Sequence, residues 1–538
     1  MRRARATMTA IGLAAAACVA PVAMQTGAQA AATTSAPRVL RVGTYDGIKG
    51  QFATIQAAVD AAHPGDWILV APGDYHETGD ITHAPVEGDH GRNGGVLITT
   101  PDIHLRGLQR NRTIVDGTAP GDSVPCTSNP SRQRYGMAND SHGTPLGRNG
   151  IVVYKADGVS VENLTVCNFL SGSGPSGNEV WWNGGDDSGV IGMKGYTGRF
   201  LTATSTFYGS PDTSASYGIF SSNAAGAGLW DDMYASNFSD SGMYVGACKR
   251  QCDMTITHAW MQYNALGYSG TNSGGALVVT DSQFDHNADG FDTNTQIAGD
   301  PPPPQDGRCP NNGFSAITHT HSCWVFMHNW VHDNNNANVP AAGSAALGPV
   351  GTGMTVSGGR FDTIVNNVFA RNGAWGLLVL PFPDGGTPDP PTTCQNSGGT
   401  EVAGLGCVLD AEGVAVVHNS FVDNGGFANP TNGDLGELVL AAGHAQNCFR
   451  NNSLPDGVTP ATLQTTQPFC GGTQTGAQLD PDLLGQVLCD SGLATCPAGA
   501  NYPQRNAVVM RPLPHLATMP NPCAGVPAND WCVGGKPV

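Results

Sequence analysis

Two aspartates, Asp289 and Asp292, stand either side of a Gly-Phe pair in the segment HNADGFDTN, residues 286–294. Only 13% of the chain is charged, so a close carboxyl pair stands out. Such a pair can supply the acid and the base of a bond-cleaving reaction, because each group shifts the pKa of the other. The alternative is purely structural, since Asp-Gly is a common turn dipeptide.

Further groups with acid–base potential follow the aspartate pair. His319 and His321 are two residues apart in ITHTHSC, so an extended segment would place both on one face. An imidazole beside a carboxylate can transfer protons near neutral pH. Arg360 in SGGRFD could hold a substrate carboxylate or pair with Asp362. We therefore predict five catalytic residues, namely Asp289, Asp292, His319, His321 and Arg360. The alternative for the histidines is a structural role, as turn and surface residues that are hydrogen-bonded to neighbouring coils.

Nearby polar and aromatic residues predict binding functions. Aspartate oxygens in loops suit Ca²⁺, and we predict as possible calcium ligands Asp285, Asp289, Asp292 and Asp306. Indole rings stack on sugars, although they pack equally well against their own protein. The predicted substrate-binding residues are Asn294, Trp181 and Trp182, the last two in the segment 177–189 that we interpret as a loop.

The N-terminus reads as a secretory signal peptide over residues 1–30, with arginines, then an alanine-rich apolar run, then small residues. Its removal would take away Cys18 and leave an even number of cysteines, as disulfide pairing outside the cell requires. Cys248/Cys252 and Cys309/Cys323 are close enough to form local loops, with zinc as a rival for the first pair. We expect a secreted, extracellular monomer without a membrane span.

The net charge of −18 argues against several partners. Nucleic acid and anionic membranes are repelled by such a surface. Polyanions such as pectate or alginate are also repelled, unless a basic patch or bound cations offset the charge. We expect an extracellular polysaccharide as the partner.

A repeat in the low twenties of residues organises most of the chain. Segments such as 257–269, 279–292 and 416–426 share apolar alternation, a small or Asn residue, and a polar turn. Short period-2 strands at this spacing predict an all-β, right-handed parallel β-helix with three strands per turn. Asn side chains at the repeated position are expected to form ladders between coils. We assign to it Ala235, Ala259, Ser282, Asn329, Asn367, Asn419 and Asn452.

Helical spacing over Ile55–Ala62, broken by Pro64-Gly65, predicts a capping helix that leads into a strand at Trp67. The expected organisation is an N-terminal segment and cap at 31–66, a β-helix at 67–455, and a Cys- and Pro-rich tail at 456–538 folded over the C-terminal end. Long loop insertions are expected at 295–313 and 334–351, and such loops often carry function.

Alignment of the repeats gives a register for the aspartates. It places Asp292 in a column with Tyr244, Ser269, Thr355 and Leu378, and Asn294 in the next outward column with Gly246, Thr271, Ser357 and Leu380. The intervening apolar column contains Phe291 and must face the core. We therefore expect Asp292 and Asn294 to point to solvent.

Several families share pieces of this pattern. The segment 52–77 resembles the entry segment of secreted right-handed parallel β-helix proteins, including pectin methylesterases, in which a helix caps the open end of the coil. NADGFD resembles the acidic motif of polygalacturonase-type hydrolases, which implies catalytic roles for Asp289 and Asp292, but the accompanying motifs are missing. GFDTN resembles the GFDPH motif of mannuronan epimerases and their lyase relatives, with Asn294 in place of the histidine. The whole chain resembles secreted actinobacterial right-handed parallel β-helix repeat proteins.

Two functions follow from these patterns. The first is a carbohydrate-active enzyme, a polysaccharide lyase, hydrolase or epimerase working in a groove beside Asp289 and Asp292. The second is a non-catalytic glycan-binding or surface protein, in which the aspartates only shape a turn.

Overall fold

The computed structural model describes residues 36–79, 94–136, 142–185, 190–248, 251–296, 305–384, 391–402 and 406–538. The predicted signal peptide lies outside the described residues. Everything that follows belongs to one compact unit, residues 37–538. In the described part of the chain, no helix is long and apolar enough to cross a membrane.

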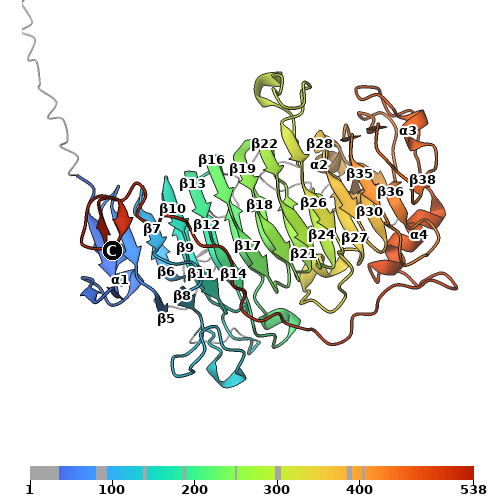
Figure 1. Cartoon of the computed structure of the whole chain (residues 1–538). Helices are drawn as coiled ribbons and strands as arrows, with labels where there is room; N and C mark the ends of the chain where they lie inside the picture. Colours follow the sequence, from blue (N-terminus) through green and yellow to red (C-terminus); the bar gives the residue numbers. More distant parts are fainter. Residues whose placement is uncertain are drawn as a thin grey trace, which may run out of the picture. The chain divides into compact units, whose positions relative to one another are not determined.

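Three long parallel sheets form the molecule, and the chain visits them in turn, as the β-helix prediction requires (Figure 1). Sheet I contains β1 (Val39–Val42), β4 (Trp67–Val70), β7 (His104–Gly107), β10 (Val159–Glu162), β13 (Met193–Arg199), β16 (Ala224–Asp231), β19 (Gln251–Thr257), β22 (Gly275–Thr280), β25 (Trp324–Met327), β28 (Asp362–Val365), β34 (Ala415–Val417) and β37 (Cys448–Arg450).

Sheet II contains β5 (Gly73–Tyr75), β8 (Thr113–Asp116), β11 (Thr165–Cys167), β14 (Thr202–Thr204), β17 (Tyr234–Ser236), β20 (Trp260–Gln262), β23 (Gln283–Asp285), β26 (Trp330–His332), β29 (Val368–Ala370) and β35 (Ser420–Val422). Sheet III contains β6 (Gly94–Ile98), β9 (Asn149–Tyr154), β12 (Asn178–Asn183), β15 (Tyr217–Ser222), β18 (Ser241–Gly246), β21 (Leu266–Thr271), β24 (Asp289–Asn294), β27 (Thr352–Ser357), β30 (Trp375–Leu380), β36 (Gly433–Glu437) and β38 (Val458–Thr459).

The solenoid starts earlier and ends slightly later than the sequence predicted. Strand β1 already pairs with β4, so the first coil precedes residue 67, and β38 pairs with β36 at the other end. The capping helix α1 (Ile55–Asp60) lies between β1 and β4, with Thr54 as its N-cap. Its apolar side chains Ile55, Ala58 and Val59 are buried, which closes the core at this end.

In the later coils, asparagine ladders hold two of the three corners. At the corner between sheets I and II, the Asn329 backbone N–H donates to Asn367 Oδ1, and that of Asn367 donates to Asn419 Oδ1, each at 2.9 Å. The predicted structural role of these asparagines is confirmed. Ala235 is not in this column, because Tyr234 pairs with Trp260 and so Met233 holds the position. A second ladder, at the corner between sheets II and III, contains Asn264, Asn287, Asn334, Asn372 and Asn424.

All fourteen cysteines after Cys18 form seven disulfides, including the two predicted local pairs. Cys248 and Cys252 are bonded to each other, so the zinc alternative is wrong. Cys394–Cys407 closes an insertion made of α2 (Pro391–Asn396) and the antiparallel strands β31 (Phe382–Pro383), β32 (Thr400–Val402) and β33 (Gly406–Leu409). Short elements elsewhere are β2 (Thr44–Tyr45), β3 (Ile48–Lys49), η1 (Pro130–Arg132), η2 (Pro211–Thr213), η3 (Pro310–Asn312) and η4 (Gly343–Leu347).

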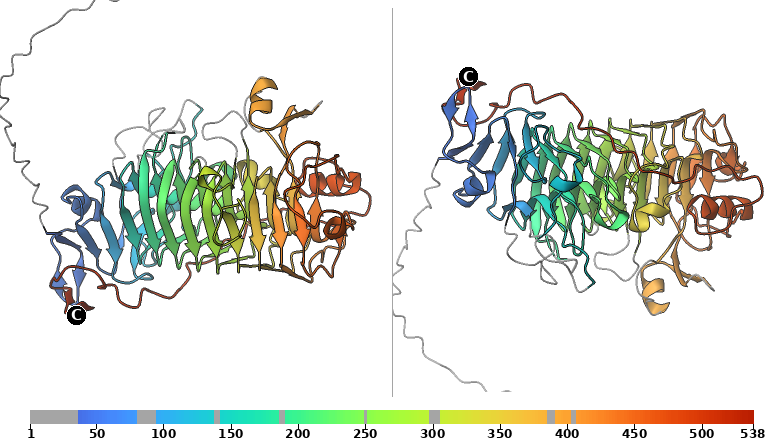
Figure 2. Two further views of the ribbon diagram at one scale, coloured as in Figure 1. Left: turned by 90° about the horizontal axis from the view of Figure 1, so that it is seen from above. Right: turned by 90° about the horizontal axis from the view of Figure 1, so that it is seen from below.

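The tail does more than cover the C-terminal end. Helices α3 (Leu463–Thr466) and α4 (Pro481–Asp490) pack there, with Leu483 against Leu378. The chain then runs back along the solenoid (Figures 1 and 2). Its last elements, β39 (Cys532–Val533) and β40 (Lys536–Pro537), lie at the first coils, where Trp531 packs against Leu69 and Leu108. Residues 503–538, which we call the strap, therefore join the two ends of the solenoid.

Candidate functional site

The predicted register of sheet III is confirmed strand by strand. Asp292 pairs with Ser269 on one side and Thr355 on the other, and Asn294 pairs with Thr271 and Ser357. Phe291 faces the core, where its ring stacks on Tyr268 with centroids 4.1 Å apart. Continuous pairing makes one outward column across seven strands, and it contains Trp181, Phe220, Tyr244, Ser269, Asp292, Thr355 and Leu378.

The prediction that Asp292 and Asn294 are open to solvent is wrong. Both face away from the core, yet Asp292 is only 8% exposed and Asn294 6%, while Asp289 is fully buried. The insertion at 334–351 folds over this part of the sheet: Gly348 lies against Asp289, and Ala345 packs on Leu266. Register fixes which way a side chain points, whereas inserted loops decide whether water reaches it.

Asp292 is held by a dense set of donors. Its Oδ1 accepts from the hydroxyls of Thr355, at 2.6 Å, and Ser357, at 3.0 Å, and its Oδ2 accepts from Asn294 Nδ2 at 2.5 Å. These hydrogen bonds favour the carboxylate, but burial is the larger effect and raises the pKa of Asp292. The Asp292 carboxyl is thus positioned from three sides and able to take up a proton.

Asp289 and Asp292 share one hydroxyl. Thr355 Oγ1 is 3.2 Å from Asp289 Oδ2 as well as 2.6 Å from Asp292 Oδ1. A hydroxyl has a single proton to donate, so the second contact needs a proton on a carboxyl group. Burial and the negative charge of Asp292 raise the pKa of Asp289 well above its usual value. The consistent arrangement is a protonated Asp289 that donates to Thr355, which in turn donates to Asp292.

A third carboxyl, that of Asp240, was not singled out from the sequence and faces the same surface. Asp240 lies immediately before β18, and its Oδ2 accepts from the Tyr217 hydroxyl at 2.8 Å. Burial raises the pKa of Asp240 to about 7, and the negative charge of Asp292 adds to this shift. Both residues are half-buried, so this carboxyl reaches the surface more than Asp292 does. Asp240 lies outside the repeated strand pattern, so alternation gave no signal for it.

Aromatic rings continue the column away from Asp292. Trp181 stacks on Phe220 with centroids 4.9 Å apart, and Phe220 contacts the rings of Tyr217 and Tyr244 at 4.6 and 4.8 Å. Trp181 is 4% exposed and donates its Nε1–H to Ser222, so it packs behind Phe220 and is closed to a ligand. Phe220, Tyr217 and Tyr244 are partly exposed and reach the surface.

Trp182 was predicted to bind substrate, and this is wrong. The segment around it is strand β12 and not a loop, and alternation turns Trp182 into the core beside Tyr196 and Trp230. Its side chain is fully buried and has no access to a ligand outside the coil. Asp186 and Asp187, from the same segment, lie outside the described residues.

The structure does not bring the predicted histidines and arginine to the aspartate pair. His319 and His321 lie in an exposed loop, where His321 Nδ1 is 2.7 Å from the Gly313 carbonyl. Arg360 donates to the Ser397 carbonyl and lies 3.5 Å from Glu412. Among the described residues, none of these three forms a hydrogen bond or ion pair with Asp289 or Asp292, so their predicted catalytic roles are not supported.

The four predicted calcium ligands do not converge on one point, because Asp285 and Asp306 lie away from the Asp289–Asp292 pair. Asp285 faces outward from sheet II and accepts from the indole of Trp260 and the amide of Gln283, both at 2.6 Å, while Asp306 lies 3.5 Å from Arg308. The oxygens of Asp289 and Asp292 already accept hydrogen bonds, which a cation would have to displace. This donor set does not fit Ca²⁺.

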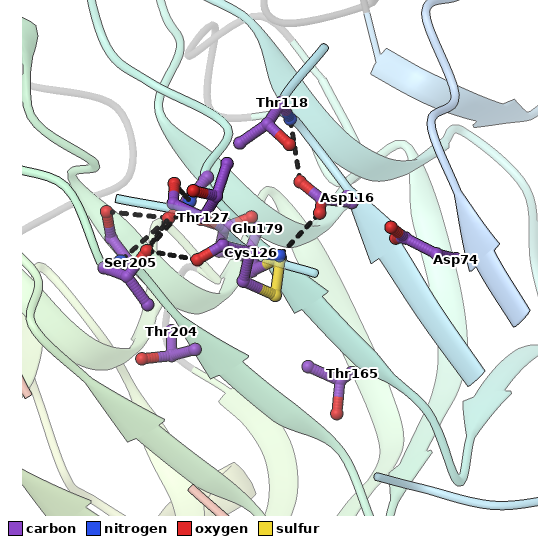
Figure 3. Close-up of a disulfide and its surroundings, with 12 residues drawn as sticks. Asp74, Asp116, Thr118, Cys126, Thr127, Thr165, Glu179, Thr204 and Ser205 are labelled. Atoms are coloured by element: carbon purple, nitrogen blue, oxygen red, sulfur yellow. Dashed lines mark hydrogen bonds between the residues drawn. A yellow bond between two sulfur atoms is a disulfide. The ribbon is translucent and has the colours of Figure 1, made fainter. Parts of the chain in front are cut away.

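Among the described residues, three groups of side chains have the spacing of a metal site, but two of them depend on cysteines that are bonded in disulfides. Asp74, His76 and Asp116, from β5 and β8 and the residue after β5, place ligand atoms within 4.8 Å of one another. Figure 3 shows the Asp116 carboxylate held by the backbone N–H groups of Thr118 and Cys126, with Asp74 beside it. This group of three side chains contains none of the four predicted calcium ligands.

No protein-family model and no curated protein matches the chain. Among solved structures, the A-modules of the Azotobacter vinelandii mannuronan C-5 epimerases AlgE6 and AlgE4 are 12% and 13% identical, with TM-scores of 0.44 and 0.40. They cover 75% and 74% of this chain and 90% of their own. Pectate lyase Pel9A is 13% identical, covers 75% of each chain, and has a TM-score of 0.34. Such distant matches assign no residue and no activity to this chain.

Proposed function

We propose that this chain is a secreted, monomeric carbohydrate-active enzyme that hydrolyses a neutral polysaccharide on the outward face of sheet III. The observation that carries the proposal is the single column in which sugar-sized aromatic rings lead to the positioned carboxyl of Asp292, with Asp240 on the same sheet just before β18. Aromatic rings bind the apolar faces of pyranoses, and paired carboxyls cleave the bonds between them. The seven disulfides support export to an oxidising compartment.

The two carboxyls differ in a way that suggests their roles. Asp240, with a pKa of about 7, is protonated in a substantial fraction of molecules at neutral pH and acts as the general acid. It gives its proton to the departing glycosidic oxygen. Asp292, held by Thr355, Ser357 and Asn294, takes a proton from the water whose oxygen attacks the anomeric carbon. The glycosidic carbon–oxygen bond breaks as the new one forms, so atoms and charge balance.

Charge on this face favours a neutral substrate over a uronate. Elimination or epimerisation at a uronic acid needs a cation to neutralise the sugar carboxylate before its C5 proton can leave. The outward column from Trp181 to Leu378 contains no arginine or lysine and includes Asp292. Asp289 lies three residues earlier on the same strand, and Asp240 immediately precedes β18. A polyanion would therefore meet carboxyls without a compensating cation on the described strands.

Strand separation predicts the stereochemistry. Asp240 precedes β18 and Asp292 lies on β24, with β21 between them. Pairing aligns Ser241 with Leu266 and Asp289, so Asp240 is also four residues earlier along the strand direction, and the two backbones are about 15 Å apart. Widely separated carboxyls leave room for a water molecule and give inversion at the anomeric carbon.

The test is turnover of neutral glycans, pectate and alginate by the full secreted chain. New reducing ends from a neutral glycan, lost in Asp292→Asn, would support hydrolysis. Unsaturated uronate product would contradict it in favour of a lyase. The matched control is Asp231→Asn, which removes a partly exposed carboxylate paired with His258 at 2.9 Å on sheet I. That variant should keep full activity.

Burial of the aspartate pair favours a second candidate function, non-catalytic glycan binding. Asp289 is fully covered and Asp292 nearly so, which restricts contact with substrate to a small area. In this case the wild-type chain would bind a glycan without releasing reducing ends, and Asp292→Asn would bind as tightly as the wild type. Loss of binding in Tyr244→Ala would then identify the aromatic rings as the binding element.

A further inference from the structure

The outward face of sheet II carries the two most exposed tryptophans among the described residues. Trp260 on β20 is 37% exposed and Trp330 on β26 is 43% exposed. Both pair with Gln283 on the strand between them, so they stand in one column about 10 Å apart. This distance suits stacking on alternate sugars of an extended chain. The aspartates of sheet III take no part in this surface.

Each indole is fixed in orientation before any ligand arrives. Trp260 donates its Nε1–H to Asp285 Oδ2 at 2.6 Å, and Tyr234 packs edge-on against its ring at 5.4 Å. Trp330 stacks on the imidazole of His332 with centroids 3.6 Å apart. Rings that are already ordered lose little conformational entropy on binding, which is what makes aromatic platforms effective.

The strap covers only the first part of this face. Leu513 packs against Ile114 and the Cys126–Cys167 disulfide, over β8 and β11. Arg511 lies over the ring of Tyr263 at 3.9 Å, at the corner beyond β20. Farther along, large apolar side chains remain exposed on four strands of sheet II, namely Trp260, Trp330, Val368 and Val422. The platform therefore begins where the strap leaves the face.

One polar atom beneath the platform has an unused hydrogen-bonding capacity. His332 is 5% exposed, and among the described residues its Nε2 has no hydrogen-bond partner; the nearest acidic oxygen, Asp285 Oδ2, is 3.8 Å away. Buried polar atoms are nearly always paired in folded proteins, by protein, water or ligand. Because this nitrogen is closed off from solvent, it is part of the layer that supports the two indoles and is not a contact for a surface-bound ligand.

Charge decides what kind of chain fits. Asp285 accepts from Trp260, Gln283 and His286, and Asp333 is paired with Arg371 at 2.5 Å. Arg371 is thus already neutralised and offers no attraction to a polyanion. A neutral ligand with apolar ring faces and many hydroxyls complements a surface of indoles and amides.

We propose that the face of sheet II formed by β20, β23 and β26, which we call the tryptophan platform, is a second binding site for a neutral polysaccharide. It holds the chain through Trp260 and Trp330 and performs no chemistry. It is separate from the proposed hydrolytic site, because its carboxyl groups anchor rings and do not face a substrate bond.

The test measures binding by the full-length chain and its variants to insoluble cellulose and, by affinity electrophoresis, to soluble xyloglucan, mixed-linkage glucan, mannan and pectate. We expect Trp330→Ala and Trp260→Ala to weaken binding to a neutral glycan about tenfold each, with Trp330→Phe restoring most of it. The control is Phe314→Ala, which removes an aromatic ring that is 68% exposed in the 305–323 loop. It should bind like the wild type.

Unchanged binding in the double variant Trp260→Ala/Trp330→Ala, or an equal loss in Phe314→Ala, would overturn the proposal. So would a change in oligomeric state, measured by light scattering, in place of a change in glycan binding. Turnover of short soluble oligosaccharides should be unaffected by the platform variants. Loss of glycan binding in the platform variants, together with no turnover by the wild type, would contradict the hydrolytic proposal and still support the tryptophan platform.

Discussion

Sheets II and III both carry carboxyl groups and aromatic rings on their outward faces, but the carboxyl groups have different hydrogen-bond partners. In sheet III, Asp292 accepts hydrogen bonds from two hydroxyls and an amide, and Asp240, just before β18, has its pKa raised by burial to about 7. In sheet II, Asp285 accepts from an indole, an amide and an imidazole, and so fixes Trp260. The partner of each carboxyl decides whether it can exchange a proton with a substrate or only orient a ring.

The largest effect should separate the two aspartates. We expect Asp292→Asn to reduce kcat by roughly 10²- to 10⁴-fold, since a general base is lost while the amide keeps the shape. Asp285→Asn should leave kcat on short oligosaccharides unchanged and weaken binding to long chains, because Trp260 loses its acceptor. Initial rates and affinity electrophoresis on both variants check this. Equal effects of the two substitutions on kcat would remove the distinction between the faces.

The pH dependence of turnover sharpens the assignment of Asp240. A general acid must be protonated, so activity should fall about tenfold per pH unit above pH 7, where Asp240 ionises. The Asp240→Asn variant should turn over substrate slowly at every pH, and its rate should not decline above pH 7. Platform binding should not follow the same curve, because the contacts there are indole rings. A profile that is flat through pH 9 in the wild type would exclude Asp240 as the acid.

Both faces depend on the asparagine ladder at the corner between them. Asn287 Nδ2 donates to the Met261 carbonyl at 3.0 Å, and Asn287 Oδ1 accepts from Asn264. Asn287→Ala leaves buried backbone groups unpaired and should lower the free energy of unfolding by about 1–3 kcal/mol. Chemical denaturation measures this, with exposed Asn506→Ala as control. Activity and platform binding should both fall; loss of only one would show that the corner does not position the other.

The repeated positions of the coils could be predicted from the sequence, and the non-repeated segments could not. Stacked coils force equivalent residues into columns, so the ladder asparagines and the register of Asp292 were predictable from spacing alone. Insertions and the tail do not repeat, so the burial of the aspartates and the path of the C-terminal residues could not be predicted from spacing. The loop containing Gly348 buried Asp289, and the strap placed Trp531 at the first coils and not at the last. Asp240 was missed because turn residues carry no alternation signal, and Trp182 was misplaced because a strand was interpreted as a loop.

The smallest effect concerns stability and pH. Burial raises the pKa of Asp240 to about 7 and that of Asp490 to about 8. The folded state therefore binds more protons than the unfolded state between about pH 4 and pH 8, so stability is lost as the pH rises through this range. We expect Asp240→Asn and Asp490→Asn each to reduce this loss by on the order of 2 kcal/mol. Thermal unfolding from pH 4 to pH 8 measures it, and wild-type stability that rises across the range would contradict the sign.

The most direct test of the central claim is a crystal structure of Asp292→Asn bound to an oligosaccharide of the best neutral glycan. We expect a sugar chain on sheet III over Phe220 and Tyr244, with one glycosidic bond between Asp240 and residue 292. Sugar bound only at Trp260 and Trp330, with sheet III empty at saturating ligand, would contradict a hydrolytic site on sheet III.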